Sequence, residues 1–181
     1  MTTPGDDPFL THAPHIGRFH NPTPKVGWSL EFLHNERRWA WCWPYTVPIY
    51  EFNLNPLHPL TYEDAKGGLW QPDRHAYRTD AGSIPPPVSW FASYHPLMYP
   101  RSYSAFHDSA CGETIDDPAH PGTIQHGLWY CAPGETEFRF RRLTWQEANR
   151  LCLVDMLQVE GASLRQANSE CWAVDTFGPR W

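Results

Sequence analysis

The chain has 181 residues, 41% of them hydrophobic, which suits one domain with an ordinary core. Its net charge of -6 is spread along the sequence with only two short basic clusters, which excludes a nucleic-acid footprint. The longest stretch without a charged residue, 81–100, contains five prolines and so predicts no transmembrane segment, and the first residues lack the features of a secretory signal.

The N-terminal segment 1–27 is rich in Pro, His, Gly and Thr and has no sustained period. We therefore expect an irregular arm followed by a single domain over 28–181. In that domain, 28–32 and 38–47 are aromatic and β-branched runs. The polar segment 34–37 between them predicts the turn of an antiparallel hairpin.

Further short strands are predicted near 69–70 and 75–79. The segment 112–142 contains three prolines and reads as an irregular excursion over the core, with strand-like pieces at 128–131 and 137–141. The five cysteines have no CxxC spacing, which favours free thiols over a disulfide framework or a zinc site.

Two short helices are predicted near 88–94 and 102–111. In the second, apolar residues recur at helical spacing, and His107 and Asp108 lie within it. This helix therefore carries the pair of neighbouring imidazole and carboxylate groups into the domain.

The C-terminal residues predict a helical hairpin. Thr144 and Glu147 form a capping box, from which a helix should run to about Glu160. Ser163 repeats the pattern before a last helix. Asp155 falls in the apolar arc of the first of these helices. The expected fold class is therefore α+β, with an N-terminal antiparallel hairpin or small sheet and a C-terminal helical core.

His107 and Asp108 are the first candidates for chemistry. Adjacent imidazole and carboxylate groups can act as a base beside a metal ligand, or as two ligands of one ion. Asp155, a carboxylate in an apolar arc, needs a partner, and His107 is one. The alternative is structural, in which His107 is a hydrogen-bonded core residue and Asp155 bonds a Trp indole or a helix N-terminus.

The segment 80–85 is a second candidate. It combines the carboxylate of Asp80, a glycine, a hydroxyl and a proline run, and so can present oxygens to a divalent cation. Ser83 lacks the context of a nucleophile elbow, which disfavours a serine triad. The alternative is a plain turn followed by a helix cap.

Four short motifs occur in an informative order: Thr79-Asp80-Ala81-Gly82-Ser83-Ile84-Pro85, Phe106-His107-Asp108, Gln146-Glu147-Ala148-Asn149 and Ala173-Val174-Asp175-Thr176-Phe177-Gly178. Together they resemble domain-of-unknown-function family 1353, a small family of phage and prophage proteins. The resemblance covers roughly 70–181 and implies a phage origin. The chain departs from the family pattern at Cys111, where an aromatic residue is usual, and at Asn149, where an acidic residue is expected.

The chain also resembles the secreted phospholipases A2, which pair a His-Asp helix with an Asp on a second helix and hold calcium. This similarity implies a cation-assisted hydrolase of a lipid or cell-envelope ester. His107 would be the base and Asp155 would orient it. Asp108, Asp80 and Asn149 would be the ligands of a cation such as calcium.

The other expectation is a non-enzymatic virion component, such as a capsid, tail or baseplate accessory. The Pro/His-rich arm 1–27 suits contacts with neighbouring subunits, so other virion proteins or further copies of the chain are the expected partners. Both hypotheses place the protein in the virion or the host cytoplasm.

Overall fold

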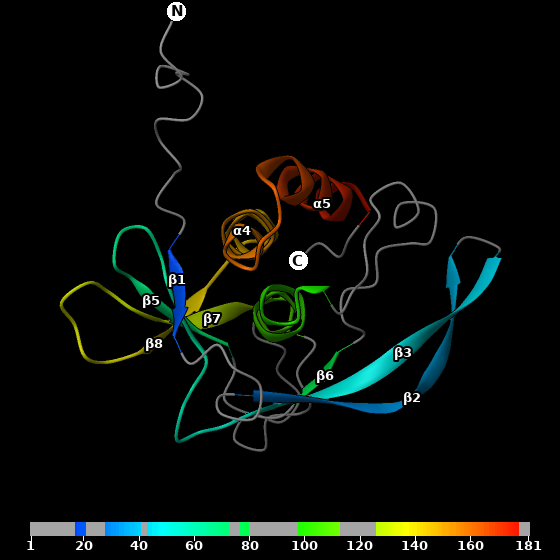
Figure 1. The fold of residues 1–181 in the computed structure, drawn as a ribbon, viewed down its shortest axis with the longest axis horizontal. Helices are drawn as coiled ribbons and strands as arrows, with labels where there is room; N and C mark the ends of the chain where they lie inside the picture. Colours follow the sequence, from blue (N-terminus) through cyan, green and yellow to red (C-terminus); the bar gives the residue numbers. More distant parts are fainter. Residues whose placement is uncertain are drawn as a thin grey trace, which may run out of the picture.

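The computed structural model describes residues 17–20, 28–40, 43–72, 77–79, 98–112 and 126–177. It contains two antiparallel sheets and a group of helices, which confirms the predicted α+β class (Figure 1). The helical elements are η2 (Arg101–His107), α2 (Asp108–Ala110), α3 (Trp145–Asn149), η3 (Arg150–Met156), α4 (Leu157–Val159) and α5 (Leu164–Phe177).

The larger sheet has five strands in the order β1 (Arg18–His20), β4 (Thr61–Glu63), β5 (Leu69–Gln71), β7 (Gly127–Cys131) and β8 (Arg139–Arg142). Residues 18–20, in the segment expected to be irregular, form β1 and pair with β4, so that expectation was wrong for these residues. The strand-like pieces predicted at 128–131 and 137–141 are confirmed as β7 and β8. They do not pass over the core as expected, because β7 is an inner strand whose Leu128 is fully buried.

The second sheet has the order β2 (Trp28–Ala40), β3 (Trp43–Leu54) and β6 (Tyr77–Thr79). The hairpin was predicted, but its turn was misplaced, because β2 runs without interruption through 34–37. A register shift between Phe32 and His34 marks a β-bulge. All side chains from 31 to 37 are exposed, so polar residues are tolerated within the strand. Figure 1 shows this ribbon extending away from the helices.

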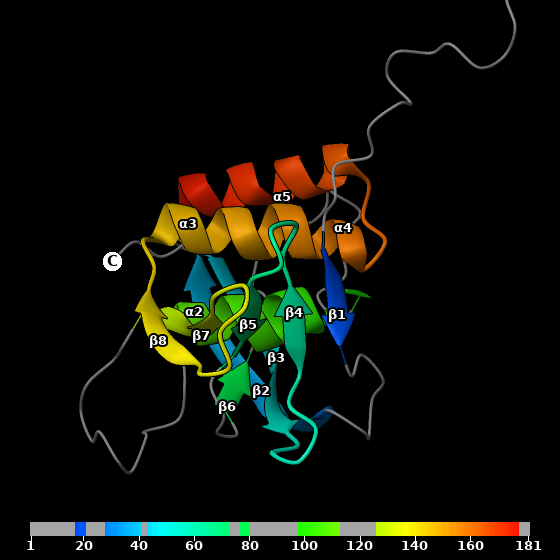
Figure 2. The ribbon, with the colours of Figure 1, turned by 90° about the vertical axis from the view of Figure 1, so that its left-hand side faces the viewer.

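The C-terminal helices follow the prediction. The capping box is present, since Thr144 Oγ1 accepts from Glu147 N at 3.2 Å and the Glu147 carboxylate accepts from Thr144 N at 2.9 Å. From there α3, η3 and α4 form one continuous helix that ends before Gly161, whose φ of 103° suits glycine. Figure 2 shows α5 lying alongside it.

The helix formed by η2 and α2 is the centre of the molecule. It lies between the two sheets and beneath the C-terminal helices (Figures 1 and 2). Residues 102–112 are all buried, which explains their apolar and small side chains. The helix expected at 88–94 lies outside the described residues. Among those described, no helix combines the length and hydropathy needed to cross a bilayer, and the four described cysteines are free.

Candidate functional site

The His-Asp pair lies at the junction of η2 and α2, where the helix is wider than an α-helix. The Asp108 N–H donates to Tyr103 O, and Ala105 N donates to Pro100 O at 3.0 Å, both five residues back. Such π-type turns are frequent at functional sites. His107 and Asp108 are only 6% and 4% exposed, so two titratable side chains lie in the protein interior.

A polar chain joins His107 to two other helices. His107 Nε2 lies 2.8 Å from Asn149 Oδ1, and Asn149 Nδ2 donates to Asp175 Oδ1 at 2.6 Å. Since the Asn149 amide nitrogen faces a carboxylate, its oxygen must be the acceptor toward the ring. His107 therefore carries a proton on Nε2, and the chain links η2, α3 and α5.

The other ring nitrogen faces Asp108. His107 Nδ1 lies 3.7 Å from Asp108 Oδ1, while Asp108 Oδ2 accepts a hydrogen bond from the Thr79 hydroxyl. Thr79 is the last residue of β6 and directly precedes Asp80 in the sequence. The structure thus attaches the strand before the predicted Asp80 loop to the His-Asp pair. Asp80 itself lies outside the described residues.

Charge and burial act on His107 in opposite directions. Burial alone would lower the pKa of His107, but its interactions with Cys111 and Asp108 outweigh burial and raise that pKa well above its usual value. Cys111 Sγ lies 3.8 Å from both ring nitrogens. A sulfur equally distant from the two lies over the ring rather than along either in-plane lone pair. Cys111 therefore packs against the His107 ring.

Asp155 occupies a different place. It is half-buried on η3, where burial raises its pKa, Arg150 partly offsets this, and the carboxylate of Asp64 raises it further. Asp155 thus interacts with the charge of Asp64, next to β4. The described contact that orients the His107 ring comes instead from Asn149. The role of Asp155 in orienting His107 stays a prediction.

Three residues of this cluster were not chosen from the sequence as members of the site: Thr79, Cys111 and Asp175. Asp175 and Thr79 lie in the motifs that carry the family resemblance, so position within those motifs was an available signal. Only the folded chain shows which partner each one has.

The described contacts of the proposed cation ligands do not fit a calcium ion. Calcium takes six to eight oxygen ligands. Both oxygens of Asp108 face other groups, and the amide oxygen of Asn149 faces His107. Within the described ranges, no group of three His, Cys, Asp or Glu side chains is arranged to hold a metal. A cation bound with the help of Asp80 stays a prediction.

Known proteins give no independent guide to this site. Comparison of the chain with models of protein families, with curated proteins and with solved structures finds no match in any of the three.

Proposed function

We propose that this chain is a phage-encoded hydrolase of lipid or cell-envelope esters, with His107 as its general base. The observation that supports the proposal best is the buried chain from His107 through Asn149 to Asp175. An imidazole oriented by one partner and placed beside a carboxylate is an arrangement used in general-base catalysis. The order of the four sequence motifs supports the phage origin.

In the proposed reaction, Asn149 holds the ring through Nε2, and Nδ1 is the nitrogen that accepts a proton. His107 takes this proton from a water molecule, whose oxygen attacks the ester carbonyl carbon. The imidazolium then returns the proton to the departing alkoxide, which gives an acid and an alcohol. Asp108, 3.7 Å from Nδ1, stabilises the imidazolium between these steps. None of these steps uses a cation.

The raised pKa of His107 adds a requirement. An imidazolium has no free lone pair on Nδ1, so only the deprotonated fraction of His107 can act as a base. We therefore expect turnover to increase as the pH rises toward the pKa of His107. A rate that falls over this range would contradict the role of His107.

The test compares His107→Gln with His58→Gln, a control in an exposed turn. Turnover of p-nitrophenyl butyrate and of phosphatidylglycerol vesicles is measured with the full chain, and circular dichroism monitors folding. Loss of a general base should reduce the rate by roughly 10²–10⁴-fold in His107→Gln only. Equal turnover by both variants, or no turnover by the unaltered chain, would overturn the proposal.

The β2–β3 ribbon favours a second candidate, a virion component that associates with copies of itself or with other virion proteins. β6 pairs with residues 50–52 of β3, so the far end of the ribbon has two strands, and an isolated two-stranded ribbon is only marginally stable in water. The ribbon also exposes Phe32 by 56% and Leu33 by 38%, which suits a protein partner. On this hypothesis, the double variant Phe32→Glu with Leu33→Glu reduces self-association in sedimentation velocity, whereas Leu57→Glu in the exposed turn does not.

A further inference from the structure

A cavity of about 330 Å³ lies away from His107, where the end of β3, the turn after it, the end of β5 and the approach to β8 meet. Its lining is mostly apolar. Around it lie Asn55, Pro56, Pro59, Gln71, Pro72 and Phe138. A concave, mainly apolar space with few polar groups is the usual form of a small-molecule site, and about 300 Å³ is the lower end of the usual size.

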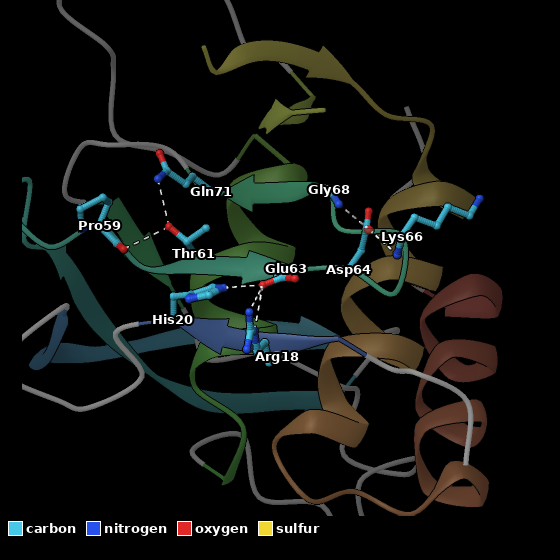
Figure 3. A network of polar contacts seen from close by, with 9 residues as sticks. All are labelled: Arg18, His20, Pro59, Thr61, Glu63, Asp64, Lys66, Gly68 and Gln71. Carbon is cyan, nitrogen blue, oxygen red and sulfur yellow. Dashed lines mark hydrogen bonds and ion pairs between the residues drawn. The ribbon is translucent and has the colours of Figure 1, made fainter. Parts of the chain in front are cut away.

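Gln71 is the polar group whose orientation is fixed. Its residue is 6% exposed, and its Nε2 donates to Thr61 Oγ1 at 3.0 Å. The Thr61 hydroxyl has a single proton, which it donates to Pro59 O at 3.2 Å. Thr61 therefore accepts from Gln71, so that the amide nitrogen of Gln71 must face Thr61. The amide oxygen is left pointing away from Thr61 (Figure 3).

This oxygen is an acceptor without a protein donor among the described contacts of Gln71. A ligand in the cavity that carries an O–H or N–H group can donate a hydrogen bond to this oxygen. The other side-chain amide in the lining is different, because Asn55 Oδ1 already accepts from Leu57 N at 3.0 Å. The cavity thus offers an apolar space with one oriented acceptor.

We propose that this cavity binds a small aromatic molecule carrying one O–H or N–H donor, of the phenol or indole type. The donor bonds to Gln71 Oε1, and the ring packs against the prolines and Phe138. A rigid ring covers apolar surface with little loss of conformational freedom, which suits a site of this size. The site is separate from His107 and does not depend on the proposed hydrolase.

The test uses two fluorinated probes that differ only at the donor, 4-fluorophenol and 4-fluorotoluene. Fluorine NMR titration of the full chain gives both affinities. One net hydrogen bond to Gln71 Oε1 predicts binding of the phenol about two- to tenfold tighter than that of the toluene. Gln71→Leu should abolish this difference, while the exposed control Gln146→Leu should leave it unchanged.

Phe138→Ala provides a second variant, since Phe138 is half-buried and its loss leaves the acceptor in place. It should weaken the binding of both probes and preserve their ratio. Equal affinities of the two probes for the unaltered chain would overturn the proposal. So would the absence of binding by either probe, or a phenol preference that survives in Gln71→Leu.

Discussion

Replacing Asn149 with leucine removes both hydrogen bonds of the polar chain at nearly constant side-chain size. His107 Nε2 then has no acceptor at a site only 6% exposed, which costs about 1–3 kcal/mol. The half-buried Asp175 can regain water, so the loss of its bond costs about 1 kcal/mol. Greater apolar burial by leucine offsets part of this sum. We expect Asn149→Leu to lower the free energy of unfolding by roughly 2 kcal/mol.

The assay is urea unfolding of the full chain, followed by tryptophan fluorescence. Gln146→Leu, the same type of change on the exposed face of α3, should stay within about 0.5 kcal/mol of the unaltered chain. If Asn149→Leu is no more destabilising than Gln146→Leu, the amide does not hold His107 and Asp175 together. The site geometry on which the hydrolase proposal depends would then be refuted.

Three further predictions concern buried acids and thiols. Glu160→Ala should lower the free energy of unfolding in urea by about 2–4 kcal/mol, because the Glu160 side chain is 3% exposed and accepts a hydrogen bond from Arg101 Nε at 2.8 Å. A decrease below about 1 kcal/mol would contradict this prediction. Burial raises the pKa of Glu170, so the free energy of unfolding should fall as the pH rises from 4.5 through the raised pKa. Glu170→Gln should flatten that decline. Identical pH curves for the variant and the unaltered chain would contradict this prediction. Burial, followed by Asp175, raises the pKa of Cys171 to about 11, so iodoacetamide at pH 8 should label it far more slowly than an unfolded control, as measured by mass spectrometry.

The helical part of the fold was predictable because its signals are local. The capping box at Thr144 and the apolar period that follows it lie within one segment, and the folded chain keeps the helix that both predict. The hairpin turn was harder to place. Polar residues at 34–37 resemble a turn, but a ribbon exposed on both faces tolerates them within a strand, so no alternation marked the true boundary.

The site was predictable only in part. His107, Asp108 and Asn149 were identified as residue types suited to chemistry, and the structure brings them together. Their pairing depends on how helices distant in sequence pack, which no local pattern encodes. Asp155 was assigned to His107 because both were expected to face inward. Which groups act on its pKa depends on the tertiary packing of η3, and Asp64, distant in sequence, is one of them.

The order of strands in the larger sheet has a consequence for biosynthesis. Leu69 at the start of β5 pairs with Cys131 at the end of β7, so that the two strands meet only after most of the chain has left the ribosome. Until then β5 presents an open edge able to pair with the wrong strand. Closing so long a loop is slow, and the nascent chain is therefore most exposed to aggregation before β7 is made. Expression at lower temperature or with a chaperone should raise the soluble yield, chiefly by protecting the nascent chain before β7 is made.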